Sequence, residues 1–298
     1  MDQKSIWRQI RVGAKEMSEK LTDADIYTSE AFRSHVQATV DSMTKDLDKH
    51  ISVSLMHNPK SDITACTDGN SLCQNTANSV ITWYKLPSSR FATVMGIVYH
   101  ELAHIRFHDF RADALADKEL EENGTLYGRM PEPDDETELD EMKEALKHPE
   151  YRKVFKSLRD ELVNCIIDAH DEERMSDYYG IVARGIEMAA SSLQGQLHTL
   201  EGYTNNKKEP LSIMTSLVLQ FARFGEILVA DEQTLYTNEY AKKLTDISQT
   251  IELATNTDNP KELYSQINVM LLFMWPYIKD AIEKCDKQQS SQAGQGQQ

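Results

Sequence analysis

Two histidines and a glutamate form the pattern in this chain with the clearest chemistry. Residues 100–104 read His-Glu-Leu-Ala-His, which is the H-E-x-x-H spacing. Positions i and i+4 share one face of an α-helix, so the imidazoles of His100 and His104 can reach one metal ion. Neutral imidazole is a good ligand for Zn²⁺, at about 2.0–2.1 Å. Glu101 lies about 100° further around the helix, where it can take a proton from a metal-activated water without being a ligand.

The surroundings of this pattern favour a functional origin. Histidine accounts for 9 of the 298 residues, so a random chain of this composition would contain only about 0.02 such matches. The preceding segment 91–99 is apolar apart from Thr93, which predicts a largely buried helix over 90–110. Buried polar side chains need partners, and a shared metal ion provides them for both histidines.

A third metal ligand has to come from another segment, because a catalytic zinc usually has three protein ligands and a water. A second long helix is predicted over 151–175, and Asn164, Asp168 and Glu172 form one polar stripe along it. We expect Asp168 to be the third ligand and Glu172 to accept a hydrogen bond from a ligand imidazole. Glu172 itself and Glu161 remain alternatives for the third ligand.

His108 and Asp109 are further alternatives that follow the second histidine closely. A ligand six residues after that histidine, beyond a glycine turn, would give the metzincin arrangement. The sequence after His104 is Ile-Arg-Phe-His-Asp-Phe and contains no glycine. On a continuous helix His108 would lie about 6 Å too far along the axis, so we favour Asp168.

The rest of the chain predicts an α+β fold that is mostly α-helical. Period-two alternation over 51–55 and the β-branched and aromatic run over 80–84 predict strands. The second of these strands could hold an extended substrate by edge pairing. We therefore expect a small zincin-like sheet beside the active-site helix, followed by a helical region. Other helices are predicted over 5–20, 29–49, 181–200, 211–229, 231–254 and 261–284.

This pattern suggests three parts of the chain. Residues 1–200 would form the zincin-like metallopeptidase domain, 201–286 a helical region packed on it, and 287–298 a disordered polar tail rich in Gln and Ser. The charged segment 111–148 contains an acidic stretch with two prolines at 131–138, which predicts an exposed loop in a solvated insertion.

Composition excludes several classes of partner. Lys+Arg 32 against Asp+Glu 48 gives a net charge of −16, which argues against nucleic acid. No run reaches the roughly 20 apolar residues of a membrane span, and the first residues lack the apolar region of a signal peptide. We therefore predict a cytoplasmic protein whose four cysteines are reduced thiols. The separation of Cys66 and Cys73 does not match a zinc knuckle.

Three blocks of the sequence, taken in order, resemble one family. They are Thr67-Asp68-Gly69, the segment from His100 to Phe110, and the segment from Asn164 to Met175. Over about residues 50–180 the chain resembles the zincin-type metallopeptidase domains of bacteria and phages that precede a von Willebrand factor A-like domain. The resemblance implies a zinc-dependent hydrolase of peptide bonds.

The chain departs from that family at three points. The family's Glu before the Asp is Ile167 here, and its Thr before Asp109 is His108. Nothing after Met175 shows the alternating strands or the Asp-x-Ser-x-Ser motif of a von Willebrand factor A-like domain. Such a domain, or another protein partner, would be supplied elsewhere.

These observations lead to one prediction and one alternative. The prediction is a zinc metallopeptidase in which His100, His104 and Asp168 hold Zn²⁺ and Glu101 is the general base acting on a peptide or protein substrate. The alternative is a non-catalytic, zinc-stabilised helical module that binds a protein. A structural zinc site would be closed by four protein ligands, whereas a catalytic site keeps a position for water.

Overall fold

The computed structural model describes residues 21–284, which form two compact units. The sheet unit comprises residues 21–107 and 174–195, and the helical unit comprises 108–173 and 196–284. This division does not coincide with the boundary expected at residue 200, because the segment 108–173 packs with the C-terminal helices. The helix predicted over 5–20 and the disordered tail predicted over 287–298 lie outside the described residues.

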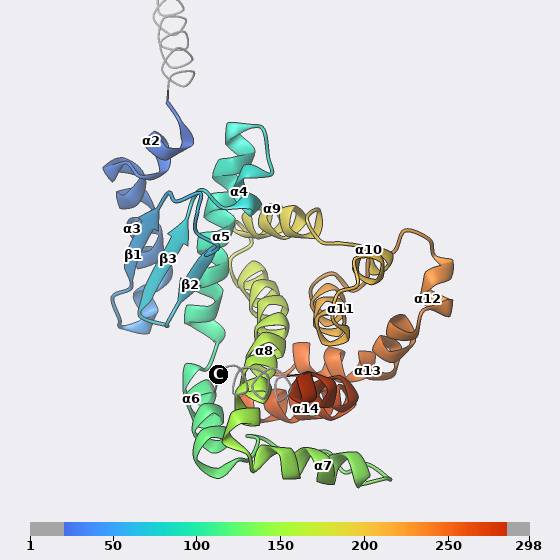
Figure 1. Cartoon of the computed structure of the whole chain (residues 1–298). Coiled ribbons are helices and arrows are strands. Elements are labelled where there is room, and N and C mark those ends of the chain that lie inside the picture. The colour runs from blue at the N-terminus through green and yellow to red at the C-terminus, as the bar shows by residue number, and fades with distance from the viewer. Residues whose placement is uncertain (1–20, 285–298) are drawn as a thin grey trace, which may run out of the picture. The chain divides into compact units, whose positions relative to one another are not determined.

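The sheet unit contains a three-stranded sheet and several helices, of which α3 and α5 pack against the strands (Figure 1). β1 (Ser52–Met56) runs parallel to β3 (Ser71–Asn75), and β2 (Ala65–Thr67) runs antiparallel to β3. The order is β1-β3-β2, so β2 lies at an edge. The helices are α2 (Asp23–Tyr27), α3 (Glu30–Met43), η1 (Lys45–Leu47), α4 (Ser79–Thr82), α5 (Pro87–Phe107), the end of α8 (Pro149–Tyr178) and α9 (Ala183–Gln194).

The prediction of a strand over 80–84 is wrong, because the helix α4 covers most of that segment. Asn78 caps this short helix by accepting a hydrogen bond from the backbone N–H of Ile81 at 3.1 Å, and Ile81 is fully buried. The capping residue outweighs the β-branched composition of the segment. The strand predicted over 51–55 is confirmed as β1, whereas β2 and β3 were not predicted.

The Thr67-Asp68-Gly69 block forms the turn that joins β2 to β3. The Asp68 carboxylate accepts hydrogen bonds from the N–H groups of Asn70 and Ser71 at 2.9 and 2.7 Å, and these bonds lower the pKa of Asp68. Gly69 has φ 82°, a backbone conformation that favours glycine. The turn fixes the register of the hairpin.

Apolar side chains of α5 pack against the sheet. Val94, Val98 and Leu102 are fully buried in one cluster with Leu55 and Leu72 of the sheet. The α3 positions Phe32, Val36, Val40 and Met43, which recur at helical spacing, are buried in the same cluster. The α5 helix ends at Phe107. The core of the sheet unit therefore packs against the part of α5 that carries the two histidines.

The backbones of α5 and α9 approach each other very closely at two glycines. A Cβ atom on Gly96 would lie 1.9 Å from the carbonyl oxygen of Gly185 and 2.4 Å from its carbonyl carbon. Backbone atoms cannot move aside as a flexible side chain can. Gly96 lies about one helical turn before His100, so this contact helps to set the position of the histidines.

We predict that Gly96→Ala destabilises the sheet unit. Alanine gains about 1 kcal/mol of helix propensity, but overpacking against α9 costs about 1–3 kcal/mol or more, so the free energy of unfolding should fall. Urea denaturation followed by circular dichroism measures the change. Gly180→Ala is the matched control, since an added Cβ there meets nothing within 4 Å. Equal stability of the two variants would contradict the prediction.

The helical unit contains the remaining elements, and the expected class, α+β and mostly α, is confirmed (Figure 1). Phe155, Leu162 and Ile166 of α8 form its core with Leu217 and Met270. The chain is again helical over 275–284. The elements of this unit are α6 (Phe110–Lys118), the π-helical turn η2 (Glu119–Asn123), α7 (Thr137–Leu146), most of α8, α10 (Leu200–Asn205), α11 (Pro210–Phe224), α12 (Gln233–Thr237), α13 (Glu239–Thr255) and α14 (Pro260–Phe273).

The charged segment 111–148 is more ordered than the sequence analysis expected. Its acidic stretch is mostly exposed and is non-helical over 132–136, as expected for a loop. The α7 residues Leu139, Met142 and Leu146, however, are buried in the core of the helical unit. The insertion therefore contributes to this core rather than being only a solvated surface. No helix within residues 21–284 is both long and apolar enough to cross a membrane.

Candidate metal centre

The α5 helix presents His100 and His104 to one point in space. Their Nε2 atoms lie 3.2 Å apart and the rings meet edge to face. Two ligands of one tetrahedral ion, each about 2.0–2.1 Å from it, are separated by about 3.3 Å. The spacing between the two nitrogens therefore fits a single shared ion.

Asp168 completes the candidate group. Its carboxylate and the ring nitrogens of His100 and His104 offer ligand atoms that all lie within 4.8 Å of one another. Asp168 is carried by α8, and about two turns later Met175 of the same uninterrupted helix is fully buried in the cluster that contains Leu102 of α5. Because α8 is continuous, the packing of Met175 also fixes the position of Asp168 along the helix. The three residues form a candidate metal-binding triad.

The other candidates for the third ligand have different surroundings. Glu161 is exposed on α8. His108 lies beyond the end of α5, and its Nε2 is 2.6 Å from a carboxylate oxygen of Asp113. Asp109 caps α6 by accepting a hydrogen bond from the N–H of Arg111 at 3.0 Å. Within residues 21–284, the group of ligand atoms that contains the two histidines includes none of these three side chains.

Glu101 is the side chain assigned as general base, and only 5% of it is exposed. The edge strand β2 packs against α5, and the charge of Glu101 acts on the Cys66 thiol of that strand. Glu101 is thus buried in the neighbourhood of the edge strand β2. Low exposure strengthens its electrostatic interactions, because the local dielectric constant is lower than that of water.

Arg223 is a charged residue that the sequence analysis missed. Its guanidinium donates a hydrogen bond to Asp168 at 3.1 Å and another to Glu172, and these three side chains are almost fully buried. Burial alone would lower the pKa of Arg223, but the carboxylates of Glu172 and Asp168 raise it. Arg223 is the only charged residue in the mostly apolar helix α11, a signal that could have pointed to buried acidic partners.

Glu172 therefore has a role beyond the one expected from the sequence. Arg223 holds its carboxylate together with that of Asp168, so one cation orients both acids. A carboxylate fixed in this way keeps its geometry when a ligand binds. The hydrogen bond expected from a ligand imidazole to Glu172 stays a prediction.

We predict that Arg223→Met destabilises the protein strongly. The substitution leaves two carboxylates buried without their cation, and breaking a buried ion pair typically costs about 3–5 kcal/mol. Urea denaturation gives the change in the free energy of unfolding.

The control for this variant is Arg33→Met. Arg33 pairs with Glu30 at 3.6 Å on the surface of α3, and exposed pairs contribute about 0–1 kcal/mol. If the two methionine variants were equally stable, the ion pair of Arg223 would not have the importance assigned to it.

Cys165 lies three positions before Asp168 on α8, but its sulfur is not part of the group of ligand atoms around the two histidines. Burial, followed by the charge of Asp168, raises the pKa of its thiol to about 12. The donor that α8 offers to this group is therefore the carboxylate of Asp168.

The end of the third sequence block anchors α8 within the sheet unit. The Arg174 guanidinium lies 4.5 Å from the centre of the Phe107 ring at the end of α5, and Met175 is fully buried. These residues have a packing role that fixes the last turns of α8. The block thus combines a candidate ligand with the contacts that position it.

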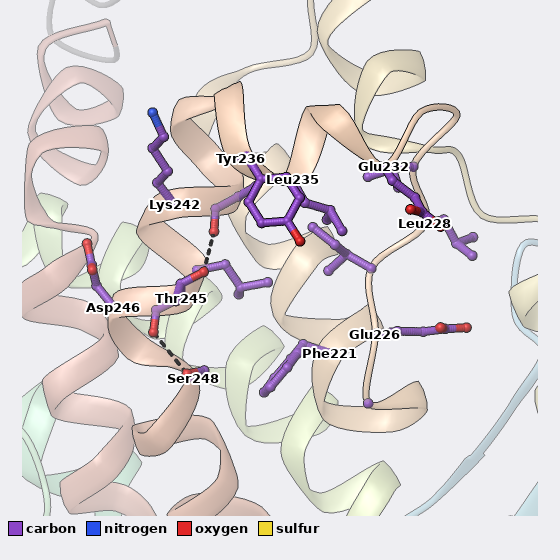
Figure 2. Close-up of a pocket in the computed structure, with 15 residues that line it drawn as sticks. Phe221, Glu226, Leu228, Glu232, Leu235, Tyr236, Lys242, Thr245, Asp246 and Ser248 are labelled. Carbon is purple, nitrogen blue, oxygen red and sulfur yellow. Dashed lines mark hydrogen bonds between the residues drawn. The ribbon is translucent and has the colours of Figure 1, made fainter.

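A separate cavity of about 1120 Å³ lies in the helical unit (Figure 2). Phe221, Leu228 and Leu235 contribute apolar walls, and Glu226 and Glu232 contribute charges. The lining residues include none of the candidate metal ligands. The cavity is therefore distinct from the triad, and its lining contains no imidazole or thiol.

Comparisons with known proteins give no family for this chain. No family model, curated protein or solved structure matches it. The chemistry of the site therefore rests on the donor atoms that α5 and α8 supply.

Proposed function

We propose that this protein is a zinc-dependent metallopeptidase of the zincin type. The observation that carries the proposal is the group of ligand atoms formed by His100 and His104 of α5 and Asp168 of α8, together with the buried Glu101 of α5. Two imidazoles and one carboxylate are a donor set found in catalytic zinc sites, which use three protein ligands. The resemblance of the three sequence blocks to zincin-type domains supports the same function.

The residues of the chain would divide the reaction between them. His100, His104 and Asp168 would hold Zn²⁺, which when bound lowers the pKa of water towards about 7 and polarises a carbonyl group. Glu101 would accept the proton of the attacking water and pass it to the leaving amine. Arg223 and Glu172 would keep the carboxylate of Asp168 in place.

The substrate would be an extended peptide that lies along the edge strand β2. The strand first expected to do this, over 80–84, is helical, whereas β2 is at the edge of the sheet and packs against α5. An edge strand offers backbone N–H and C=O groups for pairing with a peptide. The cytoplasmic location and a von Willebrand factor A-like domain supplied elsewhere stay predictions from the sequence.

Activity on an unfolded protein tests the proposal. Labelled, denatured casein should be cleaved by the purified protein, cleavage should stop when a chelator removes the metal, and Zn²⁺ should restore it. Two histidines and one carboxylate also form the set that binds Fe²⁺ in oxygenases, so Fe²⁺ is added in a parallel arm.

The outcomes separate the proposal from its alternative. Metal that binds with no cleavage under any condition would favour the non-catalytic, zinc-stabilised binding module. Cleavage that is unaffected by complete removal of the metal would contradict the proposed mechanism. Activity restored by Fe²⁺ but not by Zn²⁺ would contradict the choice of metal.

A further inference from the structure

Two cysteines face each other across the β2–β3 hairpin. Cys66 and Cys73 are direct partners in the antiparallel register, so their side chains point to the same face of the sheet. Directly opposed residues on antiparallel strands have Cα atoms about 4.5–5.5 Å apart, within the 4.4–6.8 Å that a disulfide requires.

The surroundings of the pair leave it open to reagents. Both cysteines are free thiols, Cys66 is exposed and Cys73 is half-buried, whereas Cys165 is buried. The turn between the strands is already held by Asp68 and Gly69, so closing a bond across the hairpin needs little movement of the backbone. The size of this backbone movement is important, because a disulfide with strained geometry is less stable.

We propose that Cys66 and Cys73 form a reversible redox site that reacts with low-molecular-weight disulfides. The exposed Cys66 loses its proton and attacks one sulfur of the small disulfide, which releases one small thiolate. Cys73 then loses its proton and attacks the Cys66 sulfur, which releases the second thiolate and closes the protein disulfide. The protein dithiol is oxidised and the small disulfide is reduced to two thiols, so atoms and electrons balance.

The rate of this reaction follows from the thiol chemistry. Burial, then the neighbouring thiol of Cys73 and the charge of Glu101, raise the pKa of the Cys66 thiol. Near neutral pH little thiolate is present, so the disulfide should form over hours rather than seconds. The closed bond would tie the edge strand to β3. This inference does not depend on the metallopeptidase proposal.

Glutathione disulfide is the probe that tests the site. The variant Cys165→Ser/Cys285→Ser keeps only the pair, and its two thiols should disappear over hours with a mass loss of two hydrogen atoms. No glutathione should stay attached. Adding Cys73→Ser should trap one glutathione on Cys66. If the double variant does not fold, peptide mapping of the wild-type chain gives the same readout as a linked Cys66–Cys73 peptide.

A displaced pair is the matched control. Ser71→Cys combined with Cys73→Ser moves the second thiol to the diagonal position on β3, where the separation of about 7–8 Å is too long for a disulfide. This variant should retain glutathione adducts and close no bond. Thiols that stay unreacted in the original pair, adducts that persist on it, or equally fast closure in the displaced pair would each overturn the proposal.

Discussion

Replacing Glu101 with Gln should lower the rate of peptide hydrolysis by about 10²–10⁴-fold, the usual contribution of general acid–base catalysis. Glutamine has nearly the same shape as glutamate but cannot accept the proton of the attacking water. Because Glu101 is adjacent to His100 without being part of the triad, the variant should keep its metal. The measurement compares casein cleavage with metal content on the same sample.

Glu161→Gln is the control for this variant. Glu161 is exposed on α8, and we expect its substitution to leave both cleavage and metal content unchanged. A Glu101→Gln protein that cleaves at the wild-type rate would refute the assignment of the general base. Loss of metal in that protein would instead show that Glu101 acts as a ligand.

The candidate site could largely be predicted from the sequence because helix geometry is local. The H-E-x-x-H spacing alone places His100 and His104 on one face of α5, and the polar stripe on α8 indicates Asp168. The sequence favoured Asp168 but left Glu172 and Glu161 open, since all three lie on the same helix. The positions of the ligand atoms distinguish them, because the group that contains the two histidines includes the carboxylate of Asp168.

The sheet was harder to predict because its short strands carry few of the usual signals. β3 reads Ser-Leu-Cys-Gln-Asn and β2 reads Ala-Cys-Thr, with none of the bulky β-branched or aromatic runs that mark strands. Their polar side chains have specific tertiary partners instead, as when Gln74 donates a buried hydrogen bond to the carbonyl of Val94 at 3.0 Å. Such long-range partners are not encoded in local composition.

The division into two units could not be predicted from the sequence either. The charge of 111–148 indicated a solvated insertion, but the spacing of Leu139, Met142 and Leu146 is that of an amphipathic helix with one buried face. The high content of charged residues in the whole segment obscured this periodicity. A long helix that contributes to both units, as α8 does, likewise gives no composition change at the boundary.

Replacing His104 with Ala should lower the affinity for Zn²⁺ by more than about 100-fold, because even the outer partners of metal ligands account for about 10–100-fold. Asp168→Ala should have a comparable effect if Asp168 is the third ligand. Metal content after dialysis against a weak chelator measures the loss for both variants, and circular dichroism establishes that each is folded.

Three further variants test the assignment of Asp168 as the third ligand. Glu172→Gln weakens the support of Asp168 and should lower affinity by about 10–100-fold, less than removal of a ligand. His108→Ala and Asp109→Asn should have no effect, because His108 pairs with Asp113 and Asp109 caps α6. If Asp168→Ala kept its metal while Glu172→Gln lost it, Glu172 would be the ligand. If the His104→Ala variant retained its metal, His104 would not be a ligand. The proposed metal centre would then be refuted, because it depends on two imidazoles from α5.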